Sequence, residues 1–120
     1  MSAKPRLLLL DAGAVFAALR HECWEALVSS YEVIVGSVVV REEAEFYVTR
    51  GDERVEIDLP TEVERGRIQE VTVDVPTMRR VRAQFTPEFR ERLDDGELEA
   101  LAYLLTSRVS MTVIGYDPFR

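Results

Sequence analysis

The sequence predicts an α/β protein with a parallel central sheet, because short apolar runs alternate with segments of helical periodicity. Residues 6–10 are mostly leucine and lead directly into Asp11, as expected for a buried parallel strand that ends in a turn. Residues 15–28 carry apolar side chains at every fourth position, which predicts one amphipathic helix. Residues 32–35 form a second apolar run, and two strands separated by a helix favour a right-handed parallel crossover.

The middle of the chain continues this order and then departs from it. Gly36 ends the second strand, and Ser37 is placed to cap a helix over residues 38–46. The following residues alternate between apolar and polar on both sides of a turn, which predicts a β-hairpin. We therefore predict that residues 47–76 form an insertion on the α/β core.

The last third of the chain contains two helix starts and one further strand. Thr86 followed by Pro87 predicts the first start, since threonine caps helices and proline favours their first position. Asp95 is placed to cap a second helix that begins at Gly96. The apolar residues in 109–114 then predict a third core strand.

Length and composition indicate one globular domain over residues 1–120. Hydrophobic residues make up 47% of the chain and charged residues 31%, which is too apolar for disorder. Cys23 is the only cysteine, so no internal disulfide is expected, and its place in an apolar stripe predicts a core side chain. The longest aliphatic run is far shorter than the ~20 residues that span a bilayer, and the pattern of a signal peptide is missing. We expect a cytoplasmic protein without a membrane segment.

The chain is acidic, with 22 acidic and 15 basic residues and a formal charge of -7. Such a charge disfavours a broad basic face that binds nucleic acid, so any polyanion must be held locally. One basic stretch precedes the last predicted helix, and it either contacts phosphates or is a solvated helix surface. Its members are Arg79, Arg80, Arg82, Arg90 and Arg92.

Acidic side chains follow the predicted strands, at the edge where a parallel α/β sheet has its functional crevice. Carboxylates brought together repel by about 1–4 kcal/mol per pair, and a divalent cation removes this repulsion. Oxygen ligands without histidine or cysteine suit hard ions, which predicts Mg²⁺ or Mn²⁺. Taken singly, each acid is also compatible with a turn, a helix cap or a solvated helix face. These acids are Asp11, Glu42, Glu43, Glu97, Glu99 and Asp117.

Three segments of the sequence resemble motifs of the PIN domain family, of which VapC-type toxins are well-known members. Residues 7–12 resemble the strand-aspartate motif, and residues 37–43 resemble the S/T-V-V-x-x-E motif. Residues 95–102 resemble the D-G-E-x-E-A-x-A motif. The resemblance covers residues 6–46 and 93–118, and it does not cover the predicted insertion.

The resemblance implies a three-layer α/β/α fold and a metal-dependent endoribonuclease that uses Mg²⁺ or Mn²⁺. RNA would be the substrate, with Arg79, Arg80 and Arg82 as its expected contacts. Family members are often homodimers held by a cognate antitoxin, so a second copy and an antitoxin are implied partners. Members also continue beyond the fourth acid, so the C-terminal elements here are expected to be shortened. A PIN-like module that binds without catalysis is the alternative.

Position by position, the resemblance implies four catalytic carboxylates that hold the metal, with a fifth beside them. Ser37 matches the small hydroxyl residue of the family and Asp95 is a near neighbour, so both are expected to support the site. The choice of Glu42 rather than Glu43 depends on one register, counted from Ser37. The four ligands are Asp11, Glu42, Glu99 and Asp117, and the fifth acid is Glu97.

Overall fold

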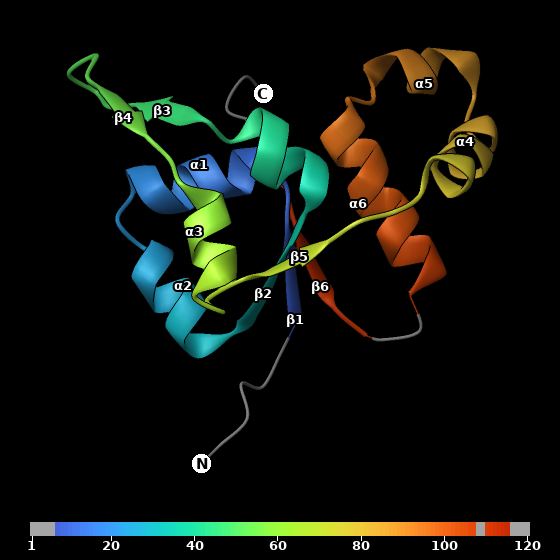
Figure 1. Cartoon of the computed structure of the whole chain (residues 1–120). Helices are drawn as coiled ribbons and strands as arrows, with labels where there is room; N and C mark the ends of the chain where they lie inside the picture. Colours follow the sequence, from blue (N-terminus) through green and yellow to red (C-terminus); the bar gives the residue numbers. More distant parts are fainter. Residues whose placement is uncertain (1–6, 108–109, 116–120) are drawn as a thin grey trace.

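The computed structural model describes residues 7–107 and 110–115, in which four parallel strands form the central sheet (Figure 1). Their order across the sheet is β5-β2-β1-β6, so β1 lies between β2 and β6. The α/β class with a parallel sheet, predicted from the sequence, is therefore confirmed. The strands are β1 (Leu7–Leu10), β2 (Glu32–Gly36), β5 (Gln69–Val71) and β6 (Thr112–Ile114).

Strand β1 is apolar along its whole length because both of its faces are buried. Leu8, Leu9 and Leu10 are at most 5% exposed. Successive side chains of a strand point to opposite faces, so Leu8 and Leu10 enter one core and Leu9 enters another. Leu8 pairs in parallel with Val33 on one side and with Thr112 on the other. The leucine run is thus explained by a central position in the sheet.

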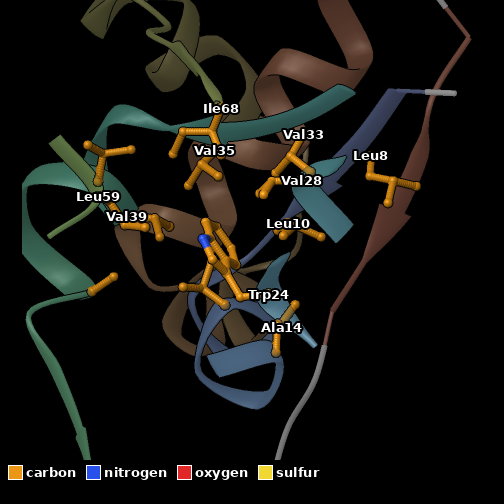
Figure 2. Packing of buried hydrophobic residues seen from close by; sticks show 14 residues of the cluster. Leu8, Leu10, Ala14, Trp24, Val28, Val33, Val35, Val39, Leu59 and Ile68 are labelled. Atoms are coloured by element: carbon orange, nitrogen blue, oxygen red, sulfur yellow. The ribbon is translucent and has the colours of Figure 1, made fainter. Parts of the chain in front are cut away.

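Three helices cover one face of the sheet and enclose the larger core (Figure 1). Trp24 lies in the middle of this core, surrounded by aliphatic side chains from β1 and β2 (Figure 2). The indole Nε1 of Trp24 donates a hydrogen bond of 2.6 Å to Glu62, and Arg67 donates another to the same carboxylate. A large aromatic side chain with a satisfied N–H therefore joins two of the helices. The three helices are α1 (Ala12–Arg20), α2 (Trp24–Ser30) and α3 (Leu59–Glu64).

The prediction of a single helix over residues 15–28 is wrong, because two shorter helices meet at a turn. Glu22 in this turn has a φ of 58°, a left-handed conformation that does not occur within a right-handed helix. The turn changes the direction of the chain, so Trp24 and Val28 face the core and Cys23 is exposed. The predicted core position of Cys23 is therefore also wrong.

The predicted helix over residues 38–46 is reduced to one π-helical turn, η1 (Val39–Glu43). Three consecutive valines enter this turn, and β-branched residues are poor helix formers. The two valines inside the turn are at most 4% exposed, so burial fixes it more than helix propensity does. Ser37 does not act as the expected cap, and its Oγ is hydrogen-bonded to Oγ1 of Thr72 instead.

The predicted insertion over residues 47–76 contains the expected hairpin and also part of the core. Strands β3 (Phe46–Val48) and β4 (Arg54–Glu56) pair antiparallel in a separate two-stranded sheet. Beyond them, Leu59 and Ile68 are at most 5% exposed, and β5 extends the main sheet by pairing with β2. Only the hairpin is therefore added to the α/β core.

Three further helices lie on the other side of the sheet (Figure 1). Leu9 and Ile34 are buried there against Tyr103, and Val81 packs with Leu98 in an outer cluster. Helix, sheet and helix layers are consistent with a three-layer α/β fold. Among the described residues, no helix has both the length and the apolar character needed to cross a membrane. The three helices are α4 (Val75–Ala83), α5 (Pro87–Arg92) and α6 (Asp95–Thr106).

The two predicted helix starts are close to the observed ones. Thr86 caps α5 and accepts a hydrogen bond of 3.3 Å from the backbone N–H of Phe89. Helix α6 begins one residue earlier than predicted, and its cap is Asp94 rather than Asp95. The predicted third strand corresponds to the shorter β6.

The central position of β1 leads to a stability prediction. Leu9→Ala should lower the free energy of unfolding by about 2–5 kcal/mol, because it leaves a cavity in a fully enclosed site. Leu105→Ala makes the same chemical change at a side chain that is 59% exposed, and it should change stability by no more than about 0.5 kcal/mol. Urea unfolding monitored by circular dichroism measures both. Equal losses for the two variants would contradict the placement of Leu9.

Candidate functional site

Asp11 lies at the carboxyl end of β1, which is flanked by β2 and β6, on the edge of the sheet where α/β proteins place their ligands. Its Oδ1 accepts a hydrogen bond of 2.7 Å from the N–H of Ala14, which caps α1. Its own N–H donates to the carbonyl oxygen of Ile114 at 3.2 Å. A Cβ on Gly115 would lie 3.0 Å from Oδ2, so the glycine lets the carboxylate pass close to β6. Asp11 is therefore held between α1 and β6.

Glu43, at the end of η1, reaches the first turn of α6. Its Oε2 accepts a hydrogen bond of 3.3 Å from the N–H of Gly96. A Cβ on Gly96 would lie 2.8 Å from Cδ of Glu43, so this contact needs a residue without a side chain. Glu42, the ligand predicted from the sequence register, is exposed instead. The structure therefore brings Glu43, and not Glu42, to the acidic end of α6.

A capping box supplies more acids at the start of α6. Asp94 Oδ1 accepts a hydrogen bond of 2.7 Å from the N–H of Glu97, and Glu97 Oε1 accepts one of 3.4 Å from the N–H of Asp94. Asp95 follows as the first helical residue and is exposed. Asp94 is not among the site residues predicted from the sequence, although an acid three residues before a glutamate is the signal of this motif.

The acids from these segments influence each other electrostatically. Burial and the nearby carboxylate of Asp94 raise the pKa of Glu43, with a smaller contribution from Glu97. Burial and Asp94 also raise the pKa of Glu97, and Asp11 contributes to this increase. A carboxylate that raises the pKa of another is close enough to repel it. Side chains that follow β1, follow β2 and begin α6 therefore form one acidic cluster, which we define as Asp11, Glu43, Asp94 and Glu97.

Glu99, the predicted third ligand, has a different environment. It is only 2% exposed, the one charged side chain buried to this degree in the described residues. Its Oε1 accepts a hydrogen bond of 2.9 Å from the N–H of Val38, and its Oε2 lies 3.5 Å from the N–H of Val73. Two residues along an α-helix are separated by about 200°, so Glu97 and Glu99 lie on opposite sides of α6. The structure therefore separates Glu99 from the acidic cluster.

The expected supporting residue Ser37 lies between β2 and β5. Besides its bond to Thr72, it hydrogen-bonds with Glu70 and helps to lower the pKa of that carboxylate. The larger cause of this decrease is Arg41, whose Nη2 donates to Glu70 at 2.7 Å. Ser37 thus belongs to a polar group that joins η1 to β5, rather than to the acidic cluster.

The predicted basic residues Arg79, Arg80 and Arg82 are exposed on α4. Val81, between them, is 4% exposed and packs against α6. Arg80 donates a hydrogen bond of 3.1 Å to Thr77 in the preceding turn. The helix that carries this positive charge is therefore packed against the helix that carries Glu97.

The donor chemistry of the acidic cluster fits a hard cation. Asp11, Glu43 and Glu97 offer only oxygen atoms. Burial and neighbouring carboxylates raise the pKa of Glu43 and Glu97, an effect that a bound cation would oppose. Within residues 7–107 and 110–115, no three acidic, histidine or cysteine side chains are already arranged around an ion position. Asp117, the predicted fourth ligand, lies outside the described residues.

The fold and the acids define an α/β domain with a carboxylate cluster at the carboxyl edge of its parallel sheet. Comparisons with protein families, curated proteins and solved structures gave no match for this chain. The resemblance to PIN domains therefore depends on its three short motifs. In the structure, two of these motifs contribute acids to the cluster at the predicted positions 11 and 97, whereas the third contributes Glu43.

The raised pKa of Glu43 leads to a prediction about stability and pH. The folded state holds a proton on Glu43 at pH values where the unfolded chain has lost it, so stability falls as pH rises through this window. In metal-free protein at pH 7, Glu43→Gln should therefore be more stable than wild type. The gain should not exceed about 1 kcal/mol, since the group is partly solvated. It should disappear below about pH 4, where both states are protonated.

Glu42→Gln is the matched control, because it removes the same charge from the neighbouring exposed position. Thermal unfolding of the three proteins from pH 3 to pH 8 measures the effect. A larger gain in stability at pH 7 for Glu42→Gln than for Glu43→Gln would contradict the raised pKa of Glu43.

Proposed function

We propose that the protein is a metal-dependent endoribonuclease of the PIN type, which hydrolyses phosphodiester bonds of RNA. Asp11, Glu43 and Glu97 are the proposed ligands of Mg²⁺ or Mn²⁺. The observation that carries the proposal is that side chains from three separate segments approach one another. Glu43 accepts a hydrogen bond from the N–H of Gly96, next to Glu97, and Asp11 adds to the effect of burial and Asp94 in raising the pKa of Glu97. Packing of the hydrophobic core does not require carboxylates from separate segments to lie together, and their mutual repulsion is unfavourable without a cation.

The proposed site matches the chemistry of a nuclease. A bound hard dication lowers the pKa of water and stabilises the negative charge that develops on an attacked phosphate. The residues of the chain would fix the ion: Asp11 is held by the N–H of Ala14, and Glu43 is held by the N–H of Gly96. Both carboxylates are thereby oriented by backbone groups rather than by mobile side chains.

The charge distribution is compatible with an RNA substrate held at one place. The net charge of -7 opposes general association with a polyanion. Arg79, Arg80 and Arg82 supply positive charge on α4, next to α6, and are the proposed phosphate contacts. RNA would then lie along α4 with its scissile bond towards the acidic cluster.

The resemblance to VapC-type toxins supports a role as the toxin of a toxin–antitoxin pair, acting in the cytoplasm as a homodimer bound by its antitoxin. A second candidate is a PIN-like module that binds partners without catalysis. The burial of Glu99 favours this second candidate, because it separates one of the four carboxylates implied by the resemblance from the others.

Metal-dependent cleavage tests the proposed ligands. Mn²⁺ should stabilise wild-type protein in a thermal shift assay and should activate cleavage of single-stranded RNA. Asp11→Asn, Glu43→Gln and Glu97→Gln should each reduce cleavage by about 10–100-fold or more, because each change removes a ligand charge.

Glu42→Gln serves as the control for this series and should keep activity close to that of wild type. If it abolishes cleavage while Glu43→Gln does not, the register predicted from the sequence is the right one. If Mn²⁺ up to millimolar concentration neither stabilises wild type nor activates it, the binding-module candidate replaces the nuclease.

The proposed RNA contacts are tested separately from catalysis. In the background of Asp11→Asn, which prevents cleavage, Arg79→Gln with Arg82→Gln should weaken binding of a short single-stranded RNA. The slope of log affinity against log salt should fall by about 0.7 per lost phosphate contact. Fluorescence anisotropy at several salt concentrations measures both quantities.

Arg54→Gln is the control, because Arg54 lies on the hairpin, pairs with Glu56 and stacks over Phe46. It should leave the affinity and the slope unchanged. An unchanged slope in the α4 variant would show that RNA binds elsewhere.

A further inference from the structure

The buried carboxylate of Glu99 is placed between three segments of the backbone. It extends from α6, accepts a hydrogen bond of 2.9 Å from Val38 N and lies 3.5 Å from Val73 N. Val38 follows β2, and Val73 follows β5. A buried carboxylate is stable only when its oxygens are hydrogen-bonded, and backbone N–H groups fill that role here.

Gly36 makes room for this carboxylate. It is the last residue of β2 and is buried, and a Cβ at this position would collide with Oε1 of Glu99 and lie 3.2 Å from Cδ. The approach of the side chain to β2 is therefore closer than any other residue at position 36 permits. Strand β2 and α6 are in this way brought together at their site-forming ends.

The linkage determines where two of the proposed ligands lie. Val38 directly precedes η1, whose last residue is Glu43, and Glu97 lies two residues before Glu99 on α6. A bond between Glu99 and Val38 thus fixes the start of η1 against the helix that carries Glu97. The hydrogen bond from Gly96 to Glu43 connects the same two segments at the other end of η1.

We infer that Glu99 is a positioning residue that holds Glu43 next to Glu97, and that it is not a ligand of the metal ion. Because it refers to a bound metal ion, the inference rests on the proposed function. Both oxygens of Glu99 face backbone N–H groups, and the side chain leaves α6 on the side opposite Glu97.

The experiment measures Mn²⁺ affinity by the electron paramagnetic resonance of free Mn²⁺, together with hydrogen exchange of the Gly96 amide. Glu99→Ala should weaken Mn²⁺ binding by about 10-fold or more, as expected when the support of a ligand is removed. It should also lose the protection of the Gly96 amide, because Glu43 moves away. Glu99→Gln retains an oxygen that can accept the hydrogen bond from Val38 N, so it should keep most of the Mn²⁺ affinity. Asp11→Asn should not keep it.

Val81→Ala is the stability control, since it creates a cavity between α4 and α6 without touching Val38. It should keep both the Mn²⁺ affinity and the Gly96 protection. If Glu99→Ala does not fold, Gly36→Ala displaces the same carboxylate by its Cβ and should give the same two losses.

The outcomes separate the inference from the proposed function. An affinity loss in Glu99→Gln as large as in Asp11→Asn would make Glu99 a ligand and overturn the inference. Unchanged Gly96 protection in both Glu99→Ala and Gly36→Ala would overturn it as well. Absence of Mn²⁺ binding in wild type would end the proposed function, while the hydrogen exchange measurement would still decide whether Glu99 holds Glu43 in place.

Discussion

The hydrogen bonds of Glu99 are the constraint on which the acidic edge of the molecule depends. A single carboxylate on α6 meets backbone N–H groups that follow β2 and β5. Hydrogen bonds to a charged acceptor contribute about 1.5–3 kcal/mol each, and the same charge without partners would be strongly destabilising in the interior. Glu99 can therefore stay buried only if the ends of β2 and β5 keep their positions relative to α6. The acidic cluster depends on the same alignment.

Two glycines make this alignment possible because they have no side chain. Gly36 lies against Glu99, and Gly96 lies against Glu43, in each case closer than a Cβ would allow. Neither has a positive φ, so the requirement is for space and not for an unusual backbone conformation. The same region thus contains two glutamates directed at two glycines, one pair buried and one pair at the acidic cluster.

The sequence predicted the parts of the fold that local patterns determine. Apolar runs identified β1 and β2, and Thr86 identified the start of α5. The site was less predictable, because a π-helical turn contains more residues per turn than an α-helix and changes which side chain faces α6. The spacing of the S/T-V-V-x-x-E motif, counted from Ser37, selected Glu42, whereas the π-helical turn directs Glu43 to α6. The burial of Glu99 was not predictable either, since it depends on N–H groups from residues far away in the sequence.

The pairing of β1 with β6 joins strands from opposite ends of the chain. Contacts between such distant segments form late, because a long loop must close first. On the ribosome, β1, α1, α2 and β2 can assemble early as a continuous unit, but Asp11 meets Glu97 only once α6 has emerged. The acidic cluster therefore cannot form during synthesis until residues 94–97 have left the ribosomal exit tunnel.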